Sequence, residues 1–415
     1  MSQDRSETAA TPFWRAVPFI IVCGSVVAMA SFGPRSSMGL FLAPMTETRG
    51  WSRETFALAI AIQNLLWGLG QPIAGGFADR YGTTRVLIAG ALLTGAALIL
   101  MPLSTSPFMF HLSAGVLFGL GLSACSFSIV LAAFGRIVSP ARRSIAFGIG
   151  TAAGSFGQFL FAPLGQALID TQGWQNALQT LGFLTFGLIF LFSLALKGKP
   201  WPQPLQGSER DQTIMEALSE ALRHPSYLLL VAGFFVCGFH LAFVTVHLPA
   251  YLIDRGLDPV WGGWSIACIG LFNIIGALAA GQLGQRHPKQ IMLVWIYLAR
   301  AALIVFFVLT PISPVTVLIF SAALGLLWLA TVPPTSGLVA VMFGPRYMAM
   351  LFGVVFLSHQ IGSFIGVWLG GRLYDTTGSY DVVWWISVAL GLFAAAVHWP
   401  IKEQEIDRPI IAAAP

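Results

Sequence analysis

Two arginines stand inside long apolar stretches of this sequence. Arg35 lies late in the stretch over residues 17–43, and Arg300 lies near the middle of the stretch over residues 291–311. A guanidinium presents its N–H donors in a fixed fork that fits a carboxylate with two parallel hydrogen bonds. All 17 acidic residues fall at the ends of apolar stretches, between them or in the tails. A buried cation needs a partner, so this pattern predicts an anionic ligand.

Each arginine also has a structural interpretation. Arg35 could extend towards the lipid headgroups, as long basic side chains near a helix end do. Arg300 could bond carbonyl groups between helices. The sequence leaves both alternatives open, and we treat Arg35 and Arg300 as candidate substrate-binding residues.

Neutral polar residues inside the apolar stretches are further candidates for a cavity lining. They are Gln63, Asn64, Asn273 and Gln360. Trp67 joins them because it stands 206 positions before Asn273, at the equivalent point of an internal repeat. Hydrogen bonding between helices is the alternative role for such side chains.

Three histidines lie inside apolar stretches. His240 and His359 are candidate proton carriers because an imidazole titrates near neutral pH. His240 is also a candidate substrate-binding residue, whereas His247 lies closer to a predicted helix end. A structural role remains the alternative for each. His240 and His247 are seven positions apart, too far for the i, i+4 pair of a helical zinc site.

The composition indicates a membrane protein. Apolar residues make up 56% of the chain, charged residues make up 9%, and the mean hydropathy is +0.78. Long apolar runs in lipid must be helical, because no water satisfies their backbone groups. We expect twelve spans, at residues 17–43, 55–77, 84–105, 109–137, 144–168, 175–196, 226–252, 260–283, 291–311, 314–343, 348–373 and 381–400.

The sequence repeats at an offset of 205 to 206 residues. Gly75, Arg80 and Gly119 recur as Gly281, Arg286 and Gly325, and the run Leu168, Asp170, Thr171, Gly173 recurs as Leu373, Asp375, Thr376, Gly378. Such a parallel duplication is typical of secondary transporters. We therefore predict an all-α membrane protein of two pseudo-symmetric six-helix bundles: residues 1–196, a cytoplasmic linker at 197–225 with a short amphipathic helix, and residues 226–415.

Basic residues predict the orientation. Sixteen of the 22 Lys and Arg residues fall on the side of both termini and four on the other side, while Arg35 and Arg300 lie within spans. This bias puts the termini in the cytoplasm. It also explains the net charge of +5, which is then no indication of nucleic-acid binding.

The turn between spans two and three, Gly75 to Arg85, resembles the G-x-x-x-D-R-x-G-x-x-[RK] signature of the major facilitator superfamily. The resemblance implies a cytoplasmic gate, for which the candidate residues are Asp79, Arg80, Arg85 and Arg142. The second copy of the motif has Gln285 and Pro288 in place of the acid and the glycine. A basic turn that only sets the topology is the alternative.

Within that superfamily the chain resembles the monocarboxylate-transporter and oxalate–formate branch. The resemblance rests on the runs Gly50-Trp51-Ser52-Arg53, Gly119-Leu120-Gly121-Leu122, Arg142-Arg143 and Gly173-Trp174-Gln175. It implies a carboxylate substrate held by a cation. The branch carries a cation in span one, roughly where Arg35 stands, and another in span eight, where this chain has no charge.

Together these features predict a secondary active transporter that moves a small organic anion, most simply a monocarboxylate, by alternating access. Proton symport is expected, with anion exchange as an alternative. An exporter of drugs or other hydrophobic compounds is a second alternative, but a cationic substrate would require a buried acid. No enzyme motif, nucleotide loop or metal spacing occurs, so we expect a transporter without cofactors and not an enzyme. We also expect the protein to be monomeric and to lie in a bacterial inner membrane.

Overall fold

The computed structural model describes residues 17–126, 129–131, 133–134, 138, 140–196, 213–344 and 348–406. Within these ranges the regular structure is helical. The first half consists of α1 (Val17–Ser36), α2 (Leu42–Arg49), α3 (Arg53–Tyr81), α4 (Thr83–Leu100), α5 (Pro107–Phe110), α6 (Phe118–Ala124) and α8 (Pro140–Ser193). The second half consists of α10 (Pro225–Asp254), α11 (Val260–Leu283), α12 (Lys289–Leu309), α13 (Pro314–Leu327), α14 (Val332–Phe343), α15 (Met348–Thr377) and α16 (Asp381–His398).

The predicted twelve membrane passes are confirmed. Eleven helical segments of the described chain are long and apolar enough to cross a bilayer, and one of them, Gly148–Leu196, has 49 residues. A single crossing takes about 20 residues. Gly173 interrupts that segment with φ +76°, a conformation that glycine adopts without strain. The segment therefore makes two passes.

Three spans contain marked departures from a simple α-helix. The fourth has a π-helical stretch, His111–Leu117, between α5 and α6. The first continues through a 3-10 turn, Met38–Phe41, to Arg49 and is 33 residues long, longer than the predicted 17–43. The tenth is broken between α13 and α14, next to Pro333 and Pro334. Proline cannot donate a backbone hydrogen bond, so carbonyl groups are freed at this break.

The linker contains the expected short helix, α9 (Ile214–Arg223), which starts with a capping box between Thr213 and Glu216. Ile214, Leu218 and Leu222 share one face at i, i+4 and i+8, which predicts the buried face, but the structure differs. Ala217 and Ala221 are buried, whereas Leu222 is 46% exposed. The helix thus packs through its small residues, because these let it lie close to α10. Residues 197–212 of the predicted linker lie outside the described ranges.

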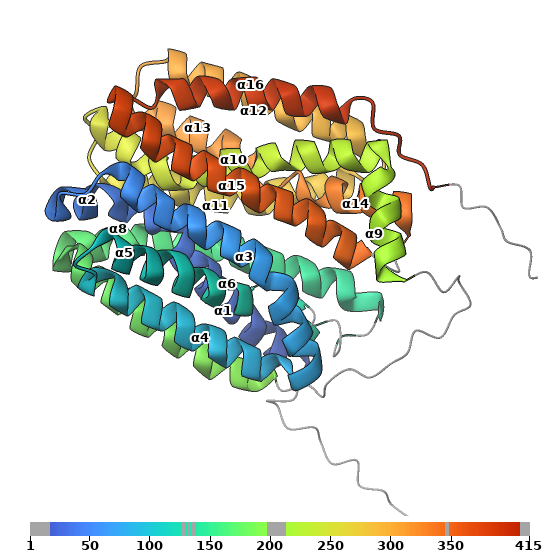
Figure 1. Cartoon of the computed structure of the whole chain (residues 1–415), viewed down its shortest axis with the longest axis horizontal. Coiled ribbons are helices and arrows are strands. Elements are labelled where there is room, and N and C mark those ends of the chain that lie inside the picture. Colours follow the sequence, from blue (N-terminus) through green and yellow to red (C-terminus); the bar gives the residue numbers. More distant parts are fainter. Residues whose placement is uncertain are drawn as a thin grey trace, which may run out of the picture.

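The helices of each half lie together in space (Figure 1). Within the halves, α1 packs along α8 and α10 packs along α15; between the halves, α3 packs along α15 and α8 along α11. The sequence repeat has a structural counterpart. A Cβ added at Gly119 would lie 2.8 Å from the carbonyl oxygen of Gln63, and one at Gly325 would lie 2.7 Å from that of Ile269. Both positions recur at an offset of 206, so the same close helix contact occurs twice.

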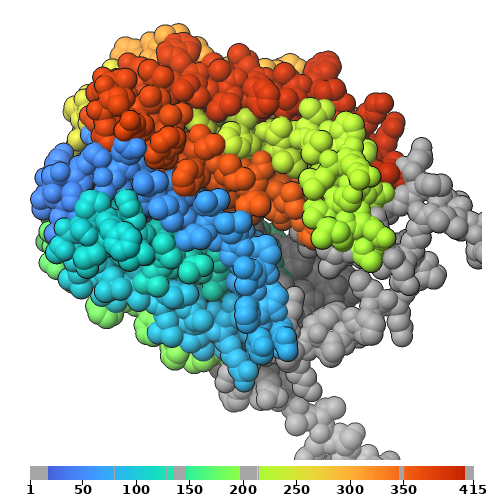
Figure 2. Space-filling model, viewed as in Figure 1, coloured from blue at the N-terminus to red at the C-terminus, as the bar shows by residue number. Residues whose placement is uncertain are grey.

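We name the two ends of the bundle by their helices. The α2 end holds the turns at residues 49–53, 254–260 and 377–381, and the α9 end lies opposite. Figure 2 shows α15 (orange to red) directly against α3 (blue) towards the α2 end. The two halves are therefore in contact at this end.

Candidate functional site

Arg35 lies at about half the depth of the bundle. Its Nη2 donates to Oδ1 of Asn64 at 2.7 Å. Asn64 stands 11 residues after Arg53, where α3 begins at the α2 end, and this corresponds to about 16 Å along the helix axis. A hydrocarbon core is about 30 Å thick. The guanidinium is thus held near mid-membrane by a partner on α3 and does not extend to the headgroups.

Aromatic rings surround this guanidinium. Its central carbon lies 4.6 Å from the ring centroid of Trp67 and 5.5 Å from that of Phe32. A cation is attracted to a ring face at such distances. Two donors in this cluster, Nε of Arg35 and Nε1 of Trp67, are buried without a hydrogen-bond partner among the described residues. Unpaired buried donors are costly, so the cluster has unused capacity for an acceptor.

The second half contributes α15 to the same place. Nε2 of Gln360 donates to the backbone carbonyl of Asn64 at 2.8 Å, and the ring of Phe356 lies 5.5 Å from that of Trp67. Nδ1 of His359 lies 3.0 Å from Oε1 of Gln360. An amide oxygen can only accept, so Nδ1 donates and Nε2 is left as the basic nitrogen of the neutral ring. The cluster therefore spans both halves.

Asn273 lies at the second interface between the halves, where α8 packs along α11. Its Nδ2 donates to Oγ of Ser155 on α8 at 2.9 Å, and its Oδ1 accepts from the backbone N–H of Leu329 at 3.0 Å. Asn273 and Ser155 are the repeat equivalents of Trp67 and Gln360. The two interfaces between the halves thus carry polar contacts at matching positions.

Gln63 does not join the Arg35 cluster through any described contact. It is fully buried, and its backbone meets Gly119 on α6. Neither of its amide atoms has a hydrogen-bond partner among the described residues.

Arg300 occupies a different environment. Its side chain is fully buried, and its guanidinium donates to the carbonyl groups of Leu327 and Trp328. These carbonyls are freed where the tenth span breaks, so Arg300 takes the place of the missing helix hydrogen bonds. This is the structural alternative stated above. Nη1 of Arg300 also donates to Sγ of Cys237 at 3.5 Å, and Cys237 in turn contacts His359 of the Arg35 cluster.

The two histidines of span seven, His240 and His247, are bonded within the second half. Nε2 of His240 lies 2.8 Å from the carbonyl of Ser387 on α16. His247 bonds the carbonyl of Val367 through Nε2 and the hydroxyl of Tyr380 through Nδ1. The structure therefore brings His359 to the cluster, and not His240 or His247.

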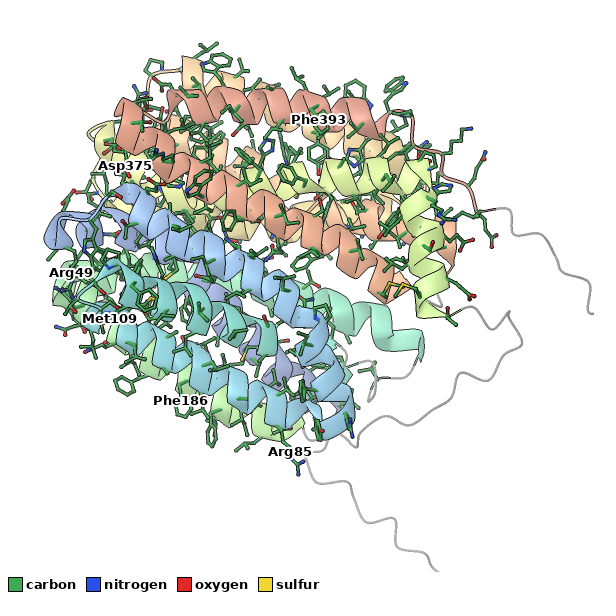
Figure 3. The ribbon with its side chains drawn as sticks, in the orientation of Figure 1. Arg49, Arg85, Met109, Phe186, Asp375 and Phe393 are labelled. Carbon is green, nitrogen blue, oxygen red and sulfur yellow. The ribbon has the colours of Figure 1, made fainter. Side chains whose placement is uncertain are left out.

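The α2 end carries a dense set of charged contacts between the halves. Arg53 of α3 donates to both carboxylate oxygens of Asp254 on α10, at 2.6 and 2.7 Å. The carboxylate of Asp375 accepts from the backbone N–H groups of Arg53 and Glu54, and Glu54 pairs with Arg372 at 3.0 Å. Figure 3 places Asp375 where α15 ends, near α2. We call these five residues the α2-end clamp.

The hydroxyl of Tyr380 also accepts from Nη1 of Arg53 at 2.9 Å. Burial raises the pKa of this hydroxyl, which therefore stays protonated and can donate to Nδ1 of His247. The clamp is thus tied to the buried interior of the second half.

The candidate gate residues lie at the α9 end. Arg80 and Arg85 are exposed, and Figure 3 shows Arg85 at the end opposite Asp375. The side chains of Asp79 and Arg142 lie outside the described set. Within the described residues, no group of three or more His, Cys, Asp or Glu side chains is placed to hold a metal ion.

The family model of the Major Facilitator Superfamily matches residues 24–366. The chain belongs to the major facilitator superfamily. Its membership explains the duplicated helices, and it makes the chain an integral membrane protein of a transporter family.

Curated relatives match nearly the whole chain. An uncharacterized MFS-type transporter, YcxA of Bacillus subtilis (strain 168), is 25% identical over 397 residues, 93% of this chain and 96% of the relative. Monocarboxylate transporter 13 of Rattus norvegicus is 27% identical over 385 residues, 88% of this chain and 84% of the relative. Monocarboxylate transporter 11 of Mus musculus is 26% identical over 386 residues, with coverages of 86% and 83%. The resemblance to the monocarboxylate-transporter branch is confirmed.

Solved structures share the fold. An inward-facing, occupied bacterial homologue of the human lysosomal transporter Spinster aligns with a TM-score of 0.70 at 15% identity, over 94% of this chain and 97% of that one. A D-xylose–proton symporter aligns with a TM-score of 0.70 at 13% identity, over 93% and 98%. At these identities the likeness shows the fold alone.

Proposed function

We propose that this protein is a secondary active transporter that moves a small organic anion, a monocarboxylate, across the membrane by alternating access. The observation that carries the proposal is Arg35. It is a cation near mid-membrane, between the two halves, with a buried unpartnered Nε. The names of its relatives, monocarboxylate transporters 11 and 13, support the same substrate class.

In this proposal Arg35 binds the substrate carboxylate. Asn64 accepts from Nη2, and Trp67 lies against the guanidinium, so both fix its orientation. Gln360 adds a contact from the second half through the Asn64 carbonyl. A site built from both halves changes when they move, as alternating access requires. Asn273 and Gln63 remain predicted lining residues, whereas Arg300 is assigned to the broken span ten.

The α2-end clamp supplies one of the two gates. The distribution of basic residues puts the α2 end outside and both termini in the cytoplasm of a plasma (inner) membrane. On that orientation the clamp closes the outer side in this conformation. The opposite gate is proposed to form from Asp79, Arg80, Arg85 and Arg142, on the strength of their motif.

Proton symport is the proposed mode of coupling. His359 is the proposed carrier because its ring lies between Gln360 of the cluster and Cys237 of α10, and an imidazole can carry a proton. His240 is less suited, because its described partner is a carbonyl of α16.

The test measures uptake of radiolabelled pyruvate into proteoliposomes, with and without an inward proton gradient. The wild type is compared with Arg35→Gln, Arg35→Lys and Arg255→Gln. Arg255 forms an exposed ion pair with Asp381 inside the second half, so its variant is a matched loss of charge away from the site. We expect a loss of 100-fold or more in Arg35→Gln, partial activity in Arg35→Lys, and normal uptake in Arg255→Gln.

Normal uptake by Arg35→Gln would contradict the binding role of Arg35. Uptake that needs internal pyruvate, and not a proton gradient, would identify an exchanger. If folded wild-type protein transports neither pyruvate nor any other carboxylate, the proposed function is wrong.

A further inference from the structure

We propose that the Arg35 site selects monocarboxylates that carry a planar aromatic body over short aliphatic hydroxy or keto acids. This inference rests on the proposed function and goes beyond it by naming the substrate class. It comes from the rings, the partially exposed surface and the unused donors around Arg35.

The first observation is the number of rings and their origin. Phe32 on α1, Trp67 on α3 and Phe356 on α15 form a continuous set, with centroids 6.5 Å apart for Phe32 and Trp67 and 5.5 Å apart for Trp67 and Phe356. The ring of His359 stacks on Phe356 at 5.6 Å with an interplanar angle of 9°. Phe32 and Trp67 lie against the guanidinium, and Phe356 of the second half extends the set of rings through its contact with Trp67. Rings at such distances prefer edge-to-face or offset contacts, which an added ring can continue.

The second observation is which side chains keep an exposed surface. Arg35, Phe32 and Phe356 are partly exposed, whereas Asn64, Gln360 and Trp67 are buried. Val22, Ser25 and Met29 extend the partly or fully exposed face of α1 towards the α9 end at helical spacing. Because Phe32 and Arg35 contact Trp67, this face is directed into the space between α1 and α3. A ligand on this face meets the Arg35 cation and the Phe32 ring, with Trp67 and its neighbour Phe356 beside them.

The third observation concerns the polar groups that remain for a ligand. Asn64 Oδ1 accepts from Arg35, the Asn64 carbonyl accepts from Gln360, and Gln360 Oε1 accepts from His359. The unpartnered atoms of the cluster are the donors Nε of Arg35 and Nε1 of Trp67. These suit two carboxylate oxygens. A substrate hydroxyl adds a further donor to a cluster whose buried unpartnered atoms are already donors, so a hydroxyl gains less there than a carboxylate, which only accepts.

These observations lead to a specific order of substrates. A phenyl group should improve binding by burying apolar surface against Phe32 and Phe356, and a hydroxyl should not help. We expect kcat/KM for 3-phenyllactate and phenylpyruvate to exceed that for L-lactate and pyruvate by about tenfold or more.

The experiment compares these two pairs, which differ only by the phenyl group, as radiolabelled substrates in proteoliposomes. The variants are Phe356→Leu and Phe32→Leu, which keep apolar volume but remove the ring. Phe393→Leu is the control, because Phe393 is an exposed phenylalanine on α16 (Figure 3). The first two variants should lower kcat/KM for the phenyl acids about three- to tenfold more than kcat/KM for the short acids. The control should behave as the wild type.

Equal kcat/KM for the phenyl and the short acids would overturn this inference and leave the proposed function intact. A ring-removing variant that weakens both substrates equally would overturn it too, because the rings would then serve stability alone. A second readout is the rise in unfolding temperature of the detergent-solubilised wild type, expected to be larger with 3-phenyllactate than with L-lactate at equal concentration. If folded wild-type protein transports neither the phenyl acids nor the short acids, both the proposed function and this inference are wrong.

Discussion

Arg35 and Arg300 are both guanidinium groups inside the membrane, but their neighbours give them different roles. Arg300 donates to the carbonyls of Leu327 and Trp328, which the break in span ten leaves without helix partners. Arg35 has one amide partner and one unpartnered buried Nε. The first arrangement stabilises the folded protein, and the second retains capacity for a ligand.

This contrast predicts opposite effects of the same substitution. Arg300→Gln should lower the free energy of unfolding by about 1–3 kcal/mol, because buried carbonyls lose their donors, while the KM of the remaining transport stays unchanged. Arg35→Gln should leave the unfolding temperature close to that of the wild type and remove transport. Thermal unfolding in detergent and uptake assays on the same preparations give both quantities. A normal unfolding temperature for Arg300→Gln, with loss of substrate binding, would instead place Arg300 in the site.

Parts of the Arg35 cluster can be predicted from the sequence because polar groups are rare in apolar spans. Arg35, Asn64, Gln360 and His359 stand out in this way, Trp67 is found through the repeat, and the structure brings them together. Phe32 and Phe356 could not be chosen, since the chain has 32 phenylalanines and most apolar positions look alike. Their spacing, three residues before Arg35 and four before Gln360, is the available signal, because such neighbours share a helix face.

At the scale of helices, the α2-end clamp joins α3 to α10 and α15. Arg53 is the centre of it, since its guanidinium binds Asp254 and lies 3.8 Å from the ring centroid of Tyr374. Asp375 adds a cap on the N-terminus of α3 from the other half, where a carboxylate is favoured by the helix dipole. At the repeat-equivalent start of α11, the N–H of Val260 is bonded locally by Asp258. The charged closure is therefore built into one of the two interfaces.

Weakening the clamp should favour the conformation that is open at the α2 end. We expect Arg53→Gln and Asp254→Asn each to increase labelling of a cysteine at Leu40, which is buried near that end, by a membrane-impermeant maleimide about three- to tenfold. The background replaces Cys23, Cys125, Cys237 and Cys268. Arg255→Gln, which breaks a pair inside the second half, is the control. Unchanged labelling in both clamp variants would show that the clamp does not hold this end closed.

At the scale of the whole molecule, the fold follows closely from the sequence. Long apolar runs, basic turns and a repeat at a fixed offset are enough for twelve spans and a superfamily, because the bilayer permits few alternatives. The sequence does not show how far the first span continues beyond residue 43, or which way each side chain points. Arg300 and His240 illustrate the second limit. The number of a span does not determine whether a residue faces the space between the halves or a neighbouring helix.

Coupling is a property of the whole transport cycle, and His359 offers a test of it. His359→Gln keeps an amide that can donate to Gln360 but removes the imidazole ring. If His359 carries the proton, this variant should lose gradient-driven uptake while keeping exchange of external for internal carboxylate at about wild-type rate. Uptake and counterflow measured in the same vesicles distinguish the two. Retention of gradient-driven uptake would instead mean that the proton moves with the substrate or through another group.

The position of Arg35 near mid-membrane has an electrical consequence. An empty site holds a positive charge within the membrane, and a bound carboxylate cancels it. Moving one full charge across 100 mV is worth about 2.3 kcal/mol, and a charge that crosses part of the field contributes a share of that energy. In proton symport the co-transported proton restores that charge in the loaded carrier, so voltage should act on both crossings, in opposite directions. The membrane potential then speeds one crossing and slows the other, and so affects how quickly the empty site returns, although each completed symport cycle moves no net charge.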